Sequence, residues 1–243
     1  MREPLVLVPG IDGTGLMYHR QVPRLERRFT VTTMRLRDEA ERMTDLVEDL
    51  HRVVTVAAPE GEPVTLVGES FGGALAMSYA LAHPGRVGHL VILNSFACVD
   101  ARRRLWLAHQ LLRVTPWKVM PLVRRLNAKR MYSPQTARDE IRGAIDLLRA
   151  STRLGYRSRI GMLREYDLRP RLRDLAVPVL FLAADGDSLV PSVAQARLMR
   201  SLAPRSTLRI LEGHCHSCLV APDLDLAEIL DGWINGDGLT GCR

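Results

Sequence analysis

The sequence predicts an α/β fold, with a minimal, mainly parallel sheet of six strands flanked by helices and a helical insertion before the fifth strand. Two observations support this prediction. Short apolar runs alternate with longer segments of helical periodicity, and a serine between glycines separates one such run from the helix that follows it. Helices that connect parallel strands cover both faces of a sheet, so the strands read as nearly continuous apolar runs. Strands are expected at residues 4–9, 30–36, 63–68, 88–94, 177–183 and 206–211.

The first strand, at residues 4–9, runs into a loop with glycines at positions 10, 13 and 15. This spacing matches neither the dinucleotide-binding fingerprint nor a Walker loop, and no Lys-Ser or Lys-Thr pair follows it. A nucleotide phosphate site is therefore not expected here. After the second strand, apolar residues recur at intervals of three and four, which predicts a helix over residues 40–57.

The third strand ends in Gly68-Glu69-Ser70-Phe71-Gly72-Gly73, and helix-like residues follow to Ala82. A strand-to-helix turn this tight strains the backbone of its central residue, while the small Gly68 and Gly72 let the strand and the helix approach each other. Ser70 is therefore expected to stand out of the fold at the positive end of a helix, where a nucleophile would be placed. An ordinary glycine-rich turn is the alternative.

About eighty residues separate the fourth strand from the fifth, too many for one crossover helix. We expect residues 97–173 to form an inserted helical cap on a core of residues 1–96 and 174–243. Helical stretches are expected from Arg102 to Val114, from Trp117 to Met131 and from Pro134 to about Gly155. Their apolar side chains would either line a channel above Ser70 or pack the cap onto the core: Leu105, Trp106, Leu107, Leu111, Leu112, Trp117, Met120, Leu122 and Val123.

Each of the last two strands leads into a loop with candidate catalytic side chains. Asp185 and Asp187 follow the fifth strand, and a helix-like stretch comes after them from Val193 to Leu202. His214 and His216 follow the sixth strand. A nucleophilic serine needs a base, and a carboxylate that orients the base, so these loops supply both partners that Ser70 requires.

The order serine, acid, histidine, each after a strand, resembles the α/β-hydrolase family. The run Asp187-Ser188-Leu189-Val190-Pro191 is similar to the family's acid loop, which implies Asp187 as the acid and leaves Asp185 to shape the turn. The family's histidine commonly has a leucine three residues later; Leu219 is at this offset from His216, so the resemblance favours His216, with His214 as the alternative. Larger members carry a hairpin before the first strand, for which this chain has no residues.

Acyl transfer also needs N–H donors aimed at the developing oxyanion. In the α/β-hydrolase family one donor follows the nucleophile and another follows an early strand, which implies the backbone of Phe71 and Ile11. Pro9 stands where the family has a histidine. The Pro-Gly-x-Asp-Gly-Thr-Gly form of residues 9–15, with Gly-Glu-Ser-Phe, is also similar to plastid lipid acyltransferases and esterases of the phytyl-ester-synthase type.

Composition limits the remaining possibilities. With 243 residues, of which 47% are hydrophobic, the chain suits one catalytic domain. It shows neither a signal-peptide pattern nor a membrane-length apolar run, so we expect a cytoplasmic protein.

Cys215 and Cys218 beside the two histidines resemble a metal-binding cluster. However, the other cysteines, Cys98 and Cys242, are isolated, so the second ligand pair of a zinc site is missing. Neither a metal nor an organic cofactor is expected.

Basic residues are concentrated in the expected cap. Residues 101–173 hold 19 Lys and Arg against 5 Asp and Glu, a net charge of +14 in a chain whose total is +7. One interpretation is a solvated cationic surface. The other is a surface that rests on anionic lipid or attracts anionic acyl donors, formed by Arg102, Arg103, Arg104, Lys118, Arg124 and Arg125 with Trp106 and Trp117. No motif or aromatic array for nucleic acid accompanies these residues, so no nucleic-acid partner is expected.

The sequence therefore predicts a serine hydrolase that cleaves carboxylic esters or thioesters of hydrophobic acyl groups through an acyl-enzyme on Ser70, His216 and Asp187. The substrate is expected to be a small molecule, and the oligomeric state is left open. A lipid acyltransferase with the same residues is one alternative, and it differs in whether an alcohol outcompetes water. A fold without activity that binds a ligand or partner is the alternative from another class.

Overall fold

The structure is a computed structural model that describes residues 2–236. Its six strands form a sheet in the order β2-β1-β3-β4-β5-β6, and every pairing between neighbours is parallel. The predicted α/β fold with a six-stranded, mainly parallel sheet is confirmed. The strands are β1 (Glu3–Val8), β2 (Phe29–Thr33), β3 (Val64–Glu69), β4 (Val87–Leu93), β5 (Val179–Ala184) and β6 (Ser206–Leu211).

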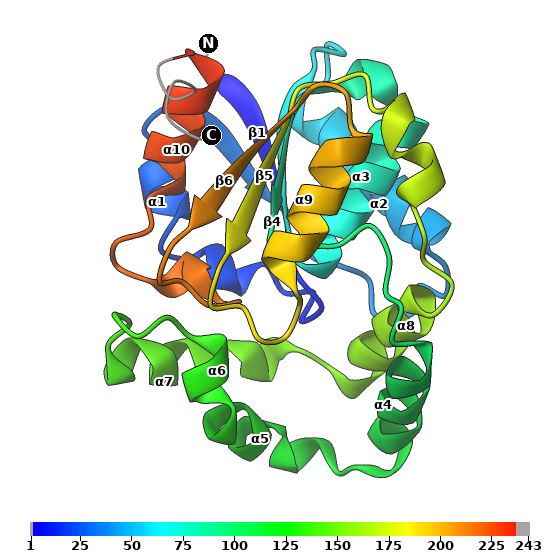
Figure 1. Cartoon of the computed structure of the whole chain (residues 1–243), viewed down its shortest axis with the longest axis vertical. Helices are drawn as coiled ribbons and strands as arrows, with labels where there is room; N and C mark the ends of the chain where they lie inside the picture. Colours follow the sequence, from blue (N-terminus) through cyan, green and yellow to red (C-terminus); the bar gives the residue numbers. More distant parts are fainter. Residues whose placement is uncertain (1, 237–243) are drawn as a thin grey trace.

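Helices cover both faces of the sheet, and each face has its own apolar core (Figure 1). One face packs against α1 (Val22–Leu25) and α10 (Leu226–Ile234). The other packs against α2 (Met43–Ala57), α3 (Phe71–Ala82) and α9 (Ser192–Leu202). None of the helices in the part of the chain that the structure describes is long and apolar enough to cross a membrane.

The strand register brings the loops of the candidate site to one edge of the sheet. Gly68 of β3 pairs with Val8 of β1 and with Ile92 of β4, so these three strands end at the same level. Ala184 and Leu211 pair at the ends of β5 and β6. Because all strands run in the same direction, the loops that follow them gather at this carboxyl edge, where ligands bind in open α/β sheets.

Residues 97–173 are called the helical segment. Most of them lie across the carboxyl edge of the sheet, at the bottom of Figure 1, and the last of them return along the molecule to the start of β5. Their helices are α4 (Arg102–Val114), α5 (Met120–Leu126), α6 (Ala128–Met131), α7 (Arg138–Leu147) and α8 (Arg153–Leu163).

Two of the three expected helical stretches in the helical segment are wrong in detail. The stretch from Trp117 to Met131 breaks into a 3-10 turn and two short helices, with Asn127 between the last two. The stretch expected to end near Gly155 ends earlier, because Ser151 and Thr152 are extended. The Thr152 hydroxyl accepts a hydrogen bond from the Gly155 N–H and so caps α8, which continues to Leu163.

Arg159 of α8 anchors the helical segment to the core. Its side chain is fully buried, and its guanidinium donates to the carbonyl oxygen of Ile11 (2.9 Å) and to Asp38 (2.6 Å). The Thr152 hydroxyl donates to the second oxygen of Asp38 (2.8 Å). A buried guanidinium is tolerated only when it is paired and hydrogen-bonded, and this one meets both conditions against the loop that follows β1.

Candidate active site

Ser70 occupies the turn between β3 and α3 with a strained backbone. Its φ of 53° lies in the left-handed region that residues with a side chain rarely adopt. The turn is held on both sides, since the Ser70 N–H donates to the Leu93 carbonyl (2.9 Å) and the Ser95 hydroxyl donates to the Ser70 carbonyl (2.6 Å). A side chain at Gly72 would overlap the carbonyl oxygens of Val8 and Pro9, which explains the glycine at this close approach.

The structure brings Ser70, His216 and Asp187 together in a line. The distance from Ser70 Oγ to His216 Nε2 is 3.1 Å, and that from His216 Nδ1 to Asp187 Oδ2 is 2.7 Å. The carboxylate of Asp187 also accepts the N–H groups of Leu189 (2.9 Å) and Val190 (3.0 Å) and the hydroxyl of Ser192. These donors fix the acid against the imidazole.

Burial and charge act in opposite directions on the two ionisable members of this line. The side chains of His216 and Asp187 are 4% and 0% exposed. Burial alone would raise the pKa of Asp187, but the hydrogen bond and charge of His216 and the other donors outweigh it and lower the pKa. Burial alone would lower the pKa of His216, yet the hydrogen bond and charge of Asp187 raise it above its ordinary value. Asp187 thus favours the protonated imidazole.

The alternative candidates, His214 and Asp185, make contacts away from Ser70. His214 contacts Ser133 and Gln135 through Nδ1, at 3.2 and 3.3 Å, and does not reach Ser70. The carboxylate of Asp185 accepts the N–H of Gly213 (2.8 Å) and so joins the two loops. The alternatives left open by the sequence, His214 for His216 and Asp185 for Asp187, are not placed beside the serine.

Asn94, directly after β4, was missed by sequence reasoning. It is fully buried, with a φ of 47°. Its Nδ2 donates to the carbonyl of His216 (2.9 Å), while its Oδ1 accepts the N–H of Ala184 (2.8 Å). One side chain thus ties the histidine loop to the strand that carries the acid loop. Its position at the carboxyl end of an apolar strand was the signal available in the sequence.

Glu69 is a second carboxylate beside the imidazole. Its side chain is 10% exposed, and its Oε1 lies 3.7 Å from His216 Nε2. Burial raises the pKa of Glu69 to about 7, against the favourable charge of His216. Glu69 therefore changes charge near neutral pH, next to the candidate base.

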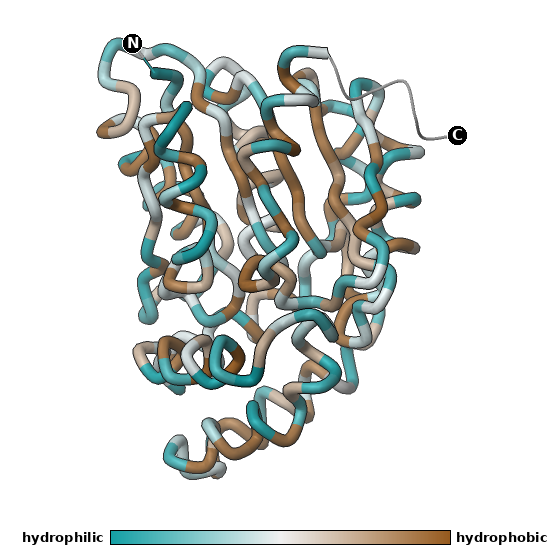
Figure 2. The backbone as a smooth tube through the Cα atoms, turned by 90° about the vertical axis from the view of Figure 1, so that its left-hand side faces the viewer, coloured by the Kyte–Doolittle hydropathy of each residue, from teal (hydrophilic) through white to brown (hydrophobic). Residues whose placement is uncertain are grey.

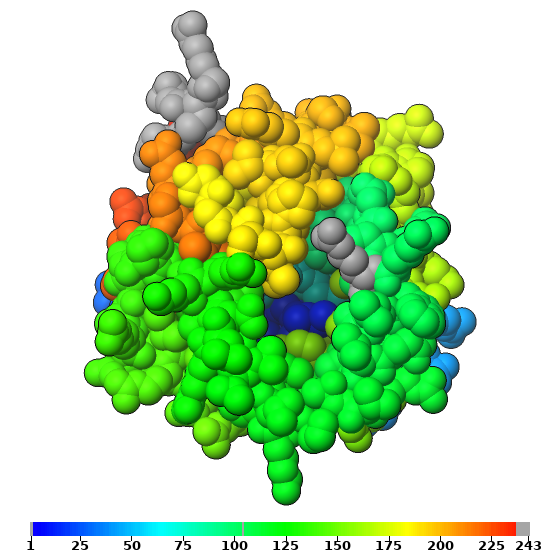
Figure 3. All heavy atoms as spheres, turned by 60° about the horizontal axis from the view of Figure 1, so that its bottom comes forward, coloured from blue at the N-terminus to red at the C-terminus, as the bar shows by residue number. Residues whose placement is uncertain are grey.

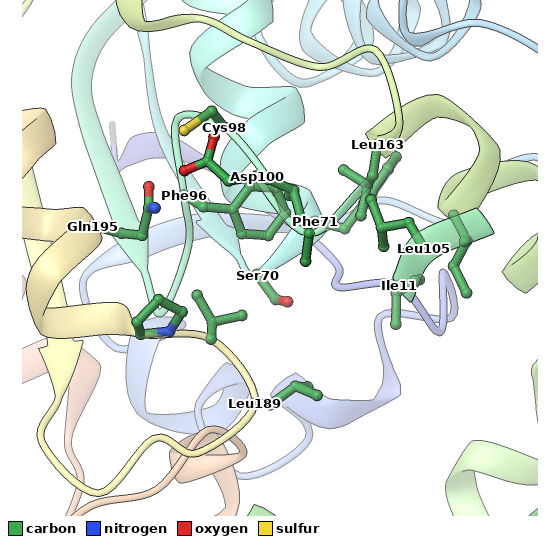
Figure 4. Close-up of a pocket in the computed structure, with 15 residues that line it drawn as sticks. Ile11, Ser70, Phe71, Phe96, Cys98, Asp100, Leu105, Leu163, Leu189 and Gln195 are labelled. Atoms are coloured by element: carbon green, nitrogen blue, oxygen red, sulfur yellow. The ribbon is translucent and has the colours of Figure 1, made fainter. Parts of the chain in front are cut away.

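Ile11 and Phe71, the expected oxyanion donors, both line the pocket that opens at Ser70 (Figure 4). Phe71 is the first residue of α3, so its N–H has no acceptor within the helix. This N–H belongs to the positive end of the helix dipole. Ile11 is held in place through its carbonyl by Arg159. Both residues therefore lie at the pocket beside Ser70, and their role as oxyanion donors stays a prediction.

The pocket at Ser70 has a volume of about 480 Å³, within the range of small-molecule sites. In the space-filling view it is a hollow beside the helical segment, with the loop after β1 at its floor (Figure 3). Its walls are mainly apolar, and they include Phe96, Leu105, Ile160, Leu163, Leu189 and Val190. Gln195, Cys98 and Asp100 lie at one side of it (Figure 4).

Nine apolar residues of the helical segment were expected either to line a channel or to pack the cap onto the core, and of these nine Leu105 alone lines the pocket at Ser70. Ile160 and Leu163 of α8 take this role, and they come from a stretch that was not assigned to the pocket. Five of the nine are exposed, among them Trp106 at 50%, Leu107 at 52% and Leu122 at 59%.

The cysteines and histidines of residues 214–218 were considered above as metal ligands. Among residues 2–236 no three or more His, Cys, Asp or Glu side chains are grouped so that they could hold a metal ion. Cys98, Cys215 and Cys218 are free and buried, and Cys218 contacts the amide of Asn94. Cys242 lies outside the described residues.

Known proteins resemble this chain in sequence and in fold. A family model described as serine aminopeptidase, S33, matches residues 33–223. The pimeloyl-(acyl-carrier protein) methyl ester esterase of Aeromonas hydrophila is 29% identical over 248 residues, which cover 95% of this chain and 94% of that protein. A protein of Cronobacter turicensis named for carbamate hydrolysis, RutD, is 26% identical over 242 residues, with 89% and 85% covered.

Solved structures agree with this result at the level of the fold. A hydrolase from Pseudomonas aeruginosa superposes with a TM-score of 0.82 at 21% identity, covering 97% of this chain and 89% of its own. An esterase from Exiguobacterium antarcticum gives a TM-score of 0.82 at 18% identity, with 96% and 92% covered.

Proposed function

Because the chain belongs to the serine aminopeptidase S33 family of α/β-hydrolases, we propose that it is a serine esterase that cleaves carboxylic esters or thioesters of hydrophobic acyl groups through an acyl-enzyme. One observation carries the proposal: Ser70 Oγ lies 3.1 Å from His216 Nε2, and the opposite ring nitrogen lies 2.7 Å from Asp187. This is the spacing that general-base activation of a serine requires.

In the proposed reaction, His216 takes the proton of Ser70 while Oγ attacks the carbonyl carbon of the substrate. The charge of Asp187 stabilises the imidazolium that forms. The tetrahedral oxyanion accepts hydrogen bonds from the N–H groups of Ile11 and Phe71. His216 then gives its proton to the leaving oxygen or sulfur, and the acyl group stays on Ser70 until His216 activates a water that releases it.

The pocket beside Phe71 supports a hydrophobic acyl group as the substrate. Its walls expose mostly carbon, so an apolar chain gains free energy by leaving water there. The relative from Aeromonas hydrophila is named for an acyl methyl ester, which agrees with an acyl substrate for this chain. We accordingly assign the acyl chain to this pocket, and no metal or organic cofactor takes part in the proposed steps.

We propose that residues 97–173 act as a cap on a core of residues 1–96 and 174–243. The contacts of Arg159 to Ile11 and Asp38 support this division, because they join two separate segments at the pocket. Leu105 and Ile160, from α4 and α8, close one side of the pocket. The cap would exclude water from the acyl group during the reaction.

The outer surface of the cap supports peripheral contact with anionic membranes. Exposed apolar side chains lie along α4 and α5. Figure 2 shows this region as a hydrophobic stretch at the bottom of the molecule. They include Trp106, Leu107, Leu111, Val114, Leu122 and Leu126. Arg103, Lys118 and Arg125 are exposed beside them, a combination typical of surfaces that lie at a lipid interface. Cytoplasmic location stays a prediction from the sequence.

Arg124 and Arg104 differ from the other residues of the expected basic surface. The guanidinium of Arg124 is turned inward, donating to the carbonyl of Leu148 (2.8 Å) and to the hydroxyl of Ser151 (2.8 Å), so Arg124 does not belong to this surface. The side chain of Arg104 lies outside the described part of the structure.

The proposed activity is tested with methyl esters of acids from acetate to palmitate, by titrating the acid that is released. We expect turnover that rises with acyl length and that Ser70→Ala abolishes, with a retained fold by circular dichroism. A fluorophosphonate probe should label the wild-type protein and not Ser70→Ala. Absence of both labelling and hydrolysis would instead favour the alternative of a fold that only binds a ligand or partner.

A further inference from the structure

A second, smaller cavity opens at Ser70 on the side of His216. Its volume is about 70 Å³, against about 480 Å³ for the acyl pocket. The two cavities share Ser70, Ile11 and Leu189, but Phe71 lines only the larger one and His216 only the smaller one. The serine therefore stands between two spaces of very different size.

The chemistry of the proposed reaction decides which part of an ester enters each space. Nε2 of His216 must protonate the leaving oxygen in the first half-reaction and deprotonate the incoming water in the second. Both oxygens therefore have to sit within hydrogen-bond reach of His216, in the smaller cavity. The acyl group is left with the apolar pocket beside Phe71. An alcohol that replaces water in the second step would use the same small cavity.

We propose that the smaller cavity is the alcohol subsite and that it restricts the enzyme to esters of short alcohols, with water or a short alcohol as acceptor. The proposal rests on the serine esterase function proposed above. A water molecule occupies about 30 Å³ in the liquid, so a cavity of about 70 Å³ accommodates roughly two waters, or an alcohol of one or two carbons. A long-chain alcohol exceeds this volume and would have to extend beyond the cavity, which argues against the lipid acyltransferase alternative.

The cap forms the wall that sets this limit, through Met131, Leu148 and Tyr156. The Arg124 guanidinium holds two of these residues in place. It donates to the Leu148 carbonyl (2.8 Å) and to the Tyr156 hydroxyl (3.2 Å), and it lies over the rings of Trp117 and Tyr156. Arg124 thus fixes the backbone of Leu148 and the side chain of Tyr156 from behind the wall.

Asp12 and Glu69 are carboxylate residues in the lining of this cavity, which is otherwise mainly apolar. Asp12 is buried and accepts the N–H of Thr14 (2.9 Å) and the Thr14 hydroxyl through the same oxygen. An alkyl chain that filled the cavity would leave these two carboxylates without solvent, whereas water or the hydroxyl group of a short alcohol would not.

The test uses octanoate esters of methanol, ethanol, 1-butanol and 1-octanol with the wild-type enzyme. One methylene beyond what a pocket holds typically costs a factor of about 10 to 200 in kcat/KM. We therefore expect kcat/KM to fall at least about tenfold between the ethyl and the butyl ester. With methyl octanoate as the acyl donor and ethanol or 1-decanol added as the acceptor, ethanol should yield ethyl octanoate and 1-decanol should yield no new ester.

Two variants connect the limit to the wall. Leu148→Ala and Met131→Ala should each raise the butyl-to-methyl ratio of kcat/KM by about tenfold, because each removes part of the wall. Leu105→Ala is the matched control: it lies in the cap and lines only the acyl pocket, so it should change the preferred acyl length and leave the butyl-to-methyl ratio as it is.

The outcomes separate this inference from the proposed function. Hydrolysis that depends on Ser70 but is equally fast for all four alcohols would overturn the inference and leave the esterase function standing. Transfer to 1-decanol in preference to water would also overturn it, in favour of an acyltransferase. No hydrolysis of any ester by the wild-type enzyme would overturn the proposed function, and the alcohol subsite with it.

Discussion

The substitution Glu69→Gln removes a buried carboxylate while keeping its size, and it should make the protein more stable at alkaline pH. Burial raises the pKa of Glu69 from 4.5 to about 7 in the folded state. The folded protein therefore holds this proton more tightly than the unfolded chain does. Between about pH 4.5 and pH 7 the unfolded chain has released this proton and the folded protein still holds it, so the free energy of unfolding falls as the pH rises through this range. Above about pH 7 it stays at the lower value.

The magnitude follows from the size of the pKa change. A tenfold change in proton affinity is worth about 1.4 kcal/mol, so the ionised Glu69 carboxylate costs roughly 3 kcal/mol of folding free energy at pH 8.5 and almost nothing at pH 4. Glutamine does not titrate, so the stability of the variant relative to the wild type should increase by roughly 3 kcal/mol between these two pH values. Any constant effect of the amide on packing cancels in this comparison.

The assay is urea unfolding of both proteins at several pH values, with free energies from linear extrapolation. Glu60→Gln serves as the control, because it removes a carboxylate from an exposed loop. A difference between wild type and Glu69→Gln that stays constant from pH 4 to pH 8.5 would refute the reasoning, since it would mean that Glu69 releases its proton as readily in the folded protein as in the unfolded chain.

Further predictions concern the histidines, Asn94 and the surface of the cap. His216→Ala should lower kcat by several orders of magnitude, and His214→Ala should lower it far less. The value of kcat on methyl octanoate shows which histidine is the base. Loss of activity in His214→Ala alone would assign the base to His214. Asn94→Gly keeps the left-handed backbone but frees the His216 loop, so kcat should fall by about 100-fold with KM little changed. Stability should also fall, because the buried Ala184 N–H and His216 carbonyl lose their partner, and Asn94→Ala should lose roughly 1 kcal/mol more. A Gly variant with wild-type kcat would limit Asn94 to a backbone role. The protein should bind anionic vesicles, but not neutral ones, at low salt. The double substitution Arg102→Ala and Arg103→Ala should weaken this binding without slowing hydrolysis of methyl acetate. Absence of binding to both vesicle types would mean that the basic residues are only a solvated surface.

The sequence predicted the sheet well because its signals are local. Each strand is an apolar run between turn residues, and the serine turn requires glycines at fixed offsets, so both can be read within a few residues. The break at Ser151 and Thr152 was missed because Thr152 caps α8 while its own hydroxyl donates to Asp38, a residue more than a hundred positions away. Such a contact leaves no periodic pattern in the chain.

The site was predictable to the same extent and for the same reason. The loops of Ser70, Asp187 and His216 follow strands, so their meeting at one edge follows from a parallel sheet. The role of Arg124 was misread, since a basic residue on a helix gives no sign of whether it faces solvent or lies over the rings of Trp117 and Tyr156. The narrower similarity to phytyl-ester-synthase-type proteins stays a prediction.

Two adjacent residues of α8 contact two parts of the proposed site. Ile160 lines the pocket that we assign to the acyl chain, and Arg159 holds the carbonyl of Ile11, whose N–H is the proposed oxyanion donor. A chain that fits poorly against Ile160 would displace α8 and, through Arg159, move the donor away from the reacting oxygen. Acyl selectivity should then appear in kcat more than in KM, because the mismatch is felt in the transition state and not only on binding.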